Sequence, residues 1–236
     1  SSAGGEQPKF LAILDDGGHV IVKFTPPLRS PGGQRWADLL YAEHLAAKTL
    51  EAHGVASAST QIVRTSERTY LVSQRFDRIG ASGRRHVVSI GKAHEAFVQG
   101  AYRNWTETAW ALALGGRLPR DAADATSIAR DFGRLIGNTD MHSGNLGLFV
   151  EQGDVKRGRF QLAPVYDMLP MRYRPNAANG GVDEYTAFTP EGAGGRAATI
   201  AVEFWERLAA ADAISGAMRE LAGEMTERVR VLARDR

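Results

Sequence analysis

Four polar residues of this chain have the types and spacing that phosphoryl transfer from a nucleotide requires. Residues 137–145 read Gly-Asn-Thr-Asp-Met-His-Ser-Gly-Asn and contain Asp140, His142 and Asn145, and Asp167 ends a later Ala-Pro-Val-Tyr-Asp run. In kinases one carboxylate orients the hydroxyl that attacks the γ-phosphate of ATP, while an Asn oxygen and a second carboxylate hold Mg²⁺. We therefore expect Asp140 to be the catalytic base, and Asn145 and Asp167 to be the metal ligands.

The elements around these residues are expected to bring them together. Asp140 and Asn145 follow a predicted amphipathic helix over 122–136, and a predicted hairpin over 146–162 would return Asp167 to the side of Asn145. Loops between such elements often carry catalytic residues. A polar turn that only satisfies backbone groups would explain the first run but not the recurrence of Asp167. A metal hydrolase is the competing use of Asp, His and Asn, but the chain has one His near these carboxylates and no His-x3-His pair.

A second run resembles a magnesium motif but is expected to have no catalytic role. Asp131-Phe-Gly spells the metal-binding motif of eukaryotic kinases, yet it lies inside the predicted helix and before the catalytic loop. We expect Phe132 in the core, Asp131 at the surface, and Asp167 in the magnesium role.

Lys23 and Glu43 are candidates for an ion pair. Lys23 ends a Val-Ile-Val-Lys strand, and Glu43 lies in a predicted helix over 36–52 among apolar residues. A carboxylate near a buried face needs a partner, and kinases pair a strand Lys with a helix Glu to hold the Lys at the phosphates. The alternative is an ordinary solvent-facing Lys.

The chain opens with the loop Ser-Ser-Ala-Gly-Gly-Glu-Gln-Pro-Lys directly before the first predicted strand. Its adjacent glycines would let backbone N–H groups approach phosphate oxygens closely. It is not a Walker A loop, which needs Gly-x4-Gly-Lys-Ser/Thr before a helix. A flexible terminus is the simpler alternative.

The predicted elements divide the chain into two lobes of an α+β fold. Residues 1–80 would form an N-lobe with the Gly-rich loop, β-strands and one helix. Residues 81–236 would form a mostly helical C-lobe with the catalytic loop, the metal-binding hairpin and C-terminal helices over 199–236.

Composition indicates an ordinary globular domain. The chain has 236 residues, 43% of them hydrophobic and 24% charged, with a formal charge of +2 and no Cys. No apolar run approaches the roughly 20 residues that a membrane span needs, and the start lacks a signal-peptide pattern. We expect a cytoplasmic protein without a membrane partner, and the missing initiator Met suggests a fragment.

Taken together, these motifs resemble the HipA-like kinases of bacterial toxin–antitoxin systems. The resemblance is carried by the 137–145 run, Leu-Ala-Pro-Val-Tyr-Asp, Gln-Arg-Phe-Asp-Arg at 74–78 and the opening loop, in the family's order. The opening is most similar to a subgroup of longer single-chain members that carry their own N-terminal DNA-binding domain.

The resemblance implies a two-lobed protein-kinase-like fold and serine/threonine kinase activity with ATP and magnesium. The opening loop and the strand lysine would bind phosphates, and the main chain at 74–76 would meet adenine. The residues thereby assigned to the nucleotide are Gly4, Gly5, Glu6, Gln7, Pro8, Lys9, Lys23, Gln74, Arg75, Phe76, His142 and Tyr166.

The resemblance also implies a regulatory site and partners. Ser2, or its neighbour Ser1, would be autophosphorylated, which would eject the loop and block ATP binding. The family's protein substrates are aminoacyl-tRNA synthetases, and an antitoxin or a DNA-binding domain outside this chain would be a partner. Two alternatives stay open: a non-catalytic nucleotide-binding regulator that acts with a DNA-binding partner, and a small-molecule kinase of the aminoglycoside or choline type.

Overall fold

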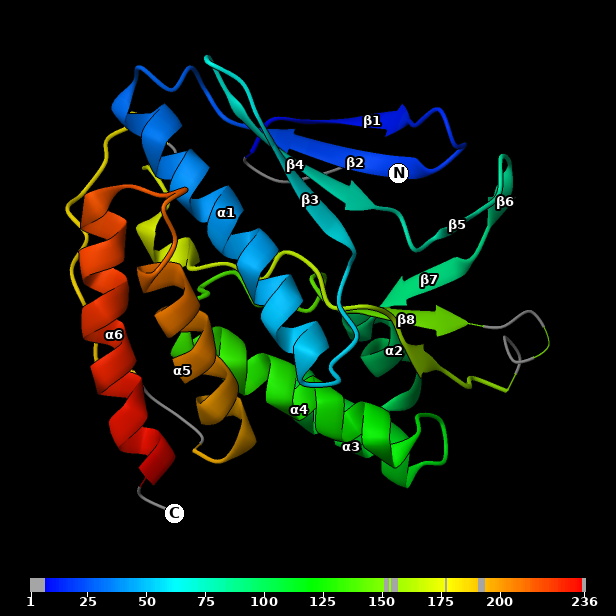
Figure 1. Ribbon diagram of the computed structural model, residues 1–236. Helices are drawn as coiled ribbons and strands as arrows, with labels where there is room; N and C mark the ends of the chain where they lie inside the picture. Colours follow the sequence, from blue (N-terminus) through cyan, green and yellow to red (C-terminus); the bar gives the residue numbers. More distant parts are fainter. Residues whose placement is uncertain (1–6, 151–152, 154–156, 177, 191–193, 235–236) are drawn as a thin grey trace.

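The computed structural model describes residues 7–150, 153, 157–176, 178–190 and 194–234. A sheet-rich part and a helical part make up the molecule (Figure 1). This arrangement confirms the predicted α+β class.

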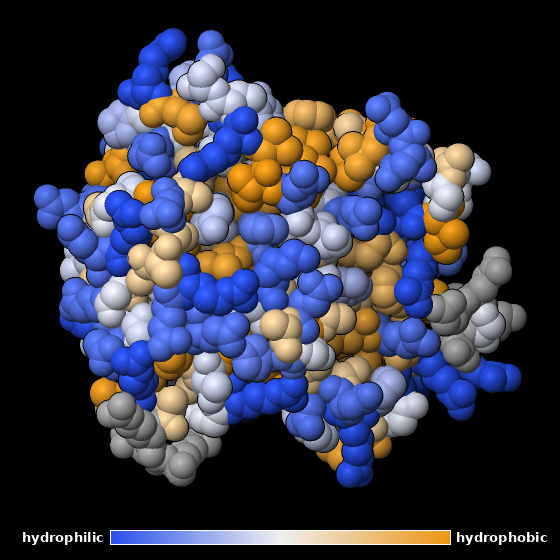
Figure 2. All heavy atoms as spheres, in the orientation of Figure 1, coloured by the Kyte–Doolittle hydropathy of each residue, from blue (hydrophilic) through white to orange (hydrophobic). Residues whose placement is uncertain are grey.

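A four-stranded antiparallel sheet, in the order β1-β2-β4-β3, forms the sheet-rich part. The turn between β1 and β2 reads Asp-Asp-Gly-Gly; Gly17 has φ 84°, and the Asp16 side chain accepts a hydrogen bond from the Gly18 N–H, which closes a β-hairpin. Figure 2 shows apolar side chains gathered over β1 and β2, where Phe10 and Ile13 are exposed. The strands are β1 Lys9–Ile13, β2 His19–Phe24, β3 Thr60–Arg64 and β4 Thr69–Gln74.

Helix α1, Pro31–Ala52, lies between β3 and β4 on one side and α5 on the other (Figure 1). It begins five residues before the predicted start at 36, so that predicted boundary was wrong. The reason is local: the Ser30 hydroxyl accepts a hydrogen bond from the Gly33 N–H, and Pro31 occupies the first turn. Ser as N-cap followed by Pro is a strong helix start.

The helical part contains the main core. Phe132, Phe204 and Trp205 are fully buried and pack ring against ring. Phe132 is therefore core, as predicted, and the Asp131-Phe-Gly run lies inside α4. The C-terminal helices expected over 199–236 are α5 and α6, and residues 210–215 separate them. The helices are α2 Ile90–Phe97, α3 Trp105–Leu114, α4 Arg120–Leu135, the short 3-10 helix η1 Met171–Tyr173, α5 Arg196–Ala209 and α6 Gly216–Arg234.

Two small sheets join the parts. The predicted hairpin is present as β8, Gly147–Val150, paired antiparallel with β9, Gln161–Leu162. Sequence reasoning missed β7, His86–Ser89, which pairs with β8 on its other side, and also the ribbon of β5, Arg78–Ile79, with β6, Gly83–Arg84. In the described part of the chain, no helix is long and apolar enough to cross a membrane.

Candidate active site

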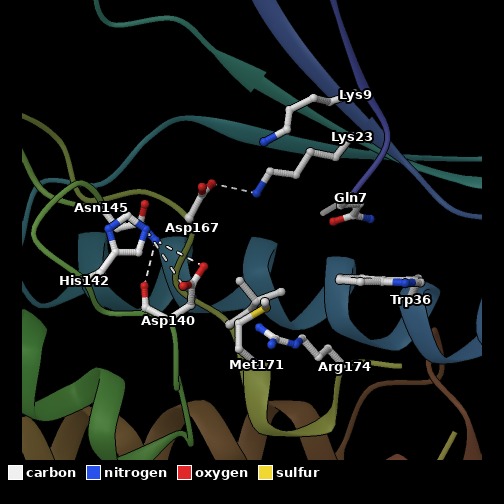
Figure 3. A pocket seen from close by; sticks show the side chains of 11 residues that line it. Gln7, Lys9, Lys23, Trp36, Asp140, His142, Asn145, Asp167, Met171 and Arg174 are labelled. Carbon is white, nitrogen blue, oxygen red and sulfur yellow. Dashed lines mark hydrogen bonds and ion pairs between the residues drawn. The ribbon is translucent and has the colours of Figure 1, made fainter. Parts of the chain in front are cut away.

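A cavity of about 410 Å³ opens between the four-stranded sheet, α1 and the loops on either side of β8 and β9 (Figure 3). Seven residues predicted from the sequence meet there: Gln7, Lys9, Lys23, Asp140, His142, Asn145 and Asp167. Four lining residues were not predicted: Trp36, Leu169, Met171 and Arg174.

Lys23 lies at the centre of a buried charge cluster. Its Nζ is 2.6 and 2.8 Å from the two carboxylate oxygens of Glu43 and 2.6 Å from Oδ1 of Asp167. The expected ion pair between strand and helix is therefore present, and a second carboxylate joins it. Burial disfavours the charged form of Lys23, but Asp167 and Glu43 outweigh it, so the pKa of Lys23 is raised above its ordinary value.

The two carboxylates respond differently to this environment. Burial raises the pKa of Glu43, and Lys23 opposes that rise. Burial also acts to raise the pKa of Asp167, but Lys23 outweighs burial, so the net pKa is lowered and Asp167 remains ionised. Asp167 is the only non-glycine residue with positive φ among those the structure describes, at 54°. Asp tolerates this conformation better than most residues.

The loop after α4 places Asp140 and Asn145 together. Asn145 Nδ2 donates to the Asp140 carbonyl at 2.7 Å and to its Oδ2 at 3.3 Å, which leaves Oδ1 as the atom of Asn145 that can coordinate a cation. His142 Nε2 is 3.9 Å from Asp140 Oδ1, and its Nδ1 accepts a hydrogen bond from the Gly144 N–H. Trp105, buried at the start of α3, donates from its indole to the His142 carbonyl at 2.9 Å. The Trp105 hydrogen bond thus fixes the loop to the helical core.

Asn138 connects the two acidic residues of the site. Its Oδ1 accepts from the Asp140 N–H at 3.0 Å, and its Nδ2 donates to the Asp167 carbonyl at 3.3 Å. The side chain is 6% exposed. Sequence reasoning assigned it no role, although an Asn directly after Gly137, just beyond the amphipathic helix α4, was a usable signal.

The residues expected at adenine lie apart from this cavity lining. Gln74 N–H donates to Ser59 O and Arg75 N–H donates to His19 O, so these two main-chain donors are already engaged within the protein. Phe76 packs against Tyr166, with ring centroids 5.7 Å apart. Burial raises the pKa of Tyr166 to about 12, and its neutral hydroxyl donates to the Gly144 carbonyl at 3.1 Å.

Of the opening loop, the structure describes Gln7, Pro8 and Lys9. Pro8 O accepts from Phe24 N at 3.2 Å, which ties the loop end to β2. Gln7 is 9% exposed and lines the cavity, and its Nε2 has no hydrogen-bond partner among the described residues. Such an orphaned donor fits an acceptor-rich ligand such as phosphate. Residues Ser1, Ser2, Gly4, Gly5 and Glu6 lie outside the described residues.

The donor set fits magnesium held together with a nucleotide, not a metal held by protein alone. Within the described ranges, no group of three or more His, Cys, Asp or Glu could hold a metal ion. Mg²⁺ is commonly bound by one or two carboxylates, with phosphates and water completing its shell. Here Asp167 supplies a carboxylate and Asn145 supplies an amide oxygen, which leaves the other positions for phosphate and water.

The fold and site define a HipA-like, protein-kinase-like domain. The sequence model of the HipA-like C-terminal domain matches residues 1–233, and the chain belongs to this family.

Individual proteins related in sequence or fold support this family assignment. The chain is 38% identical over 239 residues to Toxin YjjJ of Escherichia coli (strain K12); the match covers 98% of this chain and 53% of that protein, so the chain spans about half the length of this curated relative. HipA from the Shewanella oneidensis MR-1 complex with HipB and operator DNA has a similar fold, with a TM-score of 0.60, 17% identity and coverage of 99% and 64%. The Helicobacter pylori proinflammatory kinase CtkA matches with a TM-score of 0.59, 14% identity and coverage of 98% and 90%.

Proposed function

We propose that this chain is an ATP-dependent serine/threonine protein kinase domain of HipA toxin type. The observation that carries the proposal is the convergence, in one cavity, of a buried Lys23 paired with Glu43 and Asp167 and of a loop that presents Asp140 and Asn145. Phosphoryl transfer depends mainly on positioning and charge stabilisation, and this set supplies both. In this proposal the N-lobe is 1–80 and the C-lobe is 81–236, and the cavity lining includes residues from both ranges.

Each residue has a distinct proposed task. Asp140 accepts the proton of the attacking hydroxyl and orients it toward the phosphate. Lys23, held by Glu43, contacts the phosphates of ATP, and Lys9 and Gln7 contribute further donors from the loop end. Asn145 and Asp167 hold magnesium, which when bound neutralises charge on the phosphates.

The substrate and partners follow from the family resemblance. We propose that the domain modifies a translation-related protein such as an aminoacyl-tRNA synthetase, and that Ser2 or Ser1 is autophosphorylated. HipA of the Shewanella complex is bound to HipB and DNA. An antitoxin, or a DNA-binding domain outside this chain, is the corresponding proposed partner here.

Incubation with labelled ATP and magnesium, followed by mass spectrometry, tests this proposal. The wild-type protein should acquire phosphate on Ser2 or Ser1 and should label a protein in a cell lysate. Once phosphorylated, it should bind ATP more weakly than a Ser2→Ala protein, because the added group carries about −1.5 to −2 charges beside the phosphate site. Absence of labelling from a protein that binds ATP would instead favour a non-catalytic nucleotide-binding regulator.

A further inference from the structure

The three protons of the Lys23 ammonium group are matched by three carboxylate oxygens. Nζ lies 2.6 and 2.8 Å from Oε1 and Oε2 of Glu43, and 2.6 Å from Oδ1 of Asp167. An ammonium group has three N–H donors. A phosphate oxygen can therefore bind Lys23 only in exchange for one of these carboxylate contacts.

The contact with Asp167 is the one that can be exchanged. Glu43 is 5% exposed, and a buried carboxylate that loses its cation is strongly destabilising. The Asp167 side chain is 34% exposed and lines the cavity, where it faces Lys23 (Figure 3). A ligand that enters the cavity can thus replace Lys23 at Asp167, whereas Glu43 keeps its hold on the lysine.

We propose that the Lys23–Asp167 ion pair closes the phosphate site, and that magnesium and the nucleotide must bind together to open it. The inference rests on the proposed function, in which Asp167 is a magnesium ligand and Lys23 a phosphate ligand. Once Asp167 coordinates the metal, Lys23 loses its third acceptor and can donate that proton to a phosphate oxygen. One ion pair is exchanged for two new contacts, which involve both ligands.

Either ligand alone would bind less favourably. A nucleotide that took Lys23 without a metal would leave the Asp167 carboxylate without its cation beside the phosphate charges, and like charges at short range repel. A metal that took Asp167 without a nucleotide would have to separate it from Lys23 with no phosphate to accept the released proton. Each ligand therefore raises the affinity for the other, which is positive coupling between two sites.

Asp167 can be replaced without strain in the backbone. Its φ is 54°, a conformation that Asn and Gly adopt readily. The hydrogen bond from Asn138 is accepted by the Asp167 carbonyl, which Asp167→Asn and Asp167→Gly both keep. Both variants remove the charge that engages Lys23, and Asp167→Gly also removes the acceptor.

Calorimetric titration with a non-hydrolysable ATP analogue, in EDTA and in magnesium, tests the exchange without a catalytic step. In EDTA, Asp167→Asn and Asp167→Gly should bind the analogue about fivefold or more tightly than wild type, the size expected when a partly exposed ion pair no longer has to be broken. In magnesium the order should reverse, because both variants lack the carboxylate that holds the metal.

Two controls identify the source of this gain. Asp140→Asn removes the same charge from the same cavity but leaves the Lys23–Asp167 pair in place, so its affinity in EDTA should rise less than that of the Asp167 variants. Asp167→Asn should give the same gain in a Lys9→Met background, which separates Lys23 from the other lysine of the cavity. Urea denaturation of each variant checks that it is folded.

The exchange and the proposed function fail on different results. If wild type binds the analogue with magnesium but neither Asp167 variant binds more tightly in EDTA, the exchange is refuted and the kinase proposal stands. The same holds if Asp140→Asn gives an equal gain, or if Lys9→Met abolishes it. If wild type does not bind the analogue with magnesium, the proposed function fails and the exchange fails with it.

Discussion

Replacing Asn138 by Leu should impair both stability and catalysis, because this one side chain holds two catalytic segments. Leu has a similar volume but cannot form the bonds to the Asp140 N–H and the Asp167 carbonyl. A backbone group left without a partner costs about 1–3 kcal/mol when it is buried, and both of these hydrogen bonds are part-buried, which favours the low end of that range. With two such groups at the low end, the free energy of unfolding should fall by about 2 kcal/mol.

The catalytic effect should exceed the effect on stability alone. Asp140 and Asp167 would lose their common anchor, and a misplacement of about 1 Å can reduce a rate roughly 10²-fold. Urea denaturation gives the free energy of unfolding, and single-turnover autophosphorylation, at a temperature where the variant is folded, gives the rate. Asn138→Asp keeps an acceptor for the Asp140 N–H and should recover part of the rate.

Met225→Ala serves as a control of matched destabilisation. Met225 is fully buried in α6 and is not among the residues that line the cavity. Its truncation should cost about 2–5 kcal/mol and leave the folded protein's rate near wild type. If Asn138→Leu loses no more rate than Met225→Ala, the positioning role of Asn138 is refuted.

Three further predictions concern buried and paired charges. Lys23→Met should cost about 3–5 kcal/mol at neutral pH, since it leaves the buried Glu43 and the part-buried Asp167 without their cation. Burial raises the folded-state pKa of Glu43, so lowering the pH toward 4.5, the ordinary pKa of Glu, neutralises Glu43 and removes its need for a cation. The difference in free energy of unfolding between wild type and Lys23→Met, measured by urea denaturation, should therefore narrow as pH falls; a constant difference would contradict the account. The hydrogen bond from Arg75 lowers the pKa of Asp77 below its ordinary value of 3.8. Asp77→Asn should therefore lower the free energy of unfolding above about pH 3.8, and the difference from wild type should vanish as pH falls through the lowered folded-state pKa. Asp38→Asn should lower the melting temperature, because an amide replaces a carboxylate that accepts several hydrogen bonds; an unchanged temperature would argue against that network.

The local features of the site were predictable from sequence because the signals are local. The amphipathic pattern of α4, the Val-Ile-Val-Lys strand and the turn-bounded hairpin are each contained in a few consecutive residues. The proximity of Lys23 and Glu43 followed because a strand and the next helix must pack through their apolar faces. A single-residue cap signal, Ser30 before Pro31, was available and would have placed the start of α1 correctly.

The features that sequence reasoning missed depend on distant partners. Strand β7 has only four residues, and it is a strand because β8, far along the chain, pairs with it. Trp36 is separated in sequence from the catalytic loop, and only the packing of α1 places it at the cavity. The main-chain donors of Gln74 and Arg75 are engaged by Ser59 and His19, which no sequence pattern indicates.

The most direct test of the central claim is transfer of labelled phosphate by wild-type protein and by Asp140→Asn protein. Both should bind ATP with magnesium at similar affinity, because Asp140 is proposed to contact the acceptor and not the nucleotide. The variant should label itself and Ser/Thr peptides at least about 10²-fold more slowly, since base catalysis and orientation are lost together. Labelling by Asp140→Asn at a near wild-type rate would contradict the assignment of this cavity as a kinase active site with Asp140 as its base.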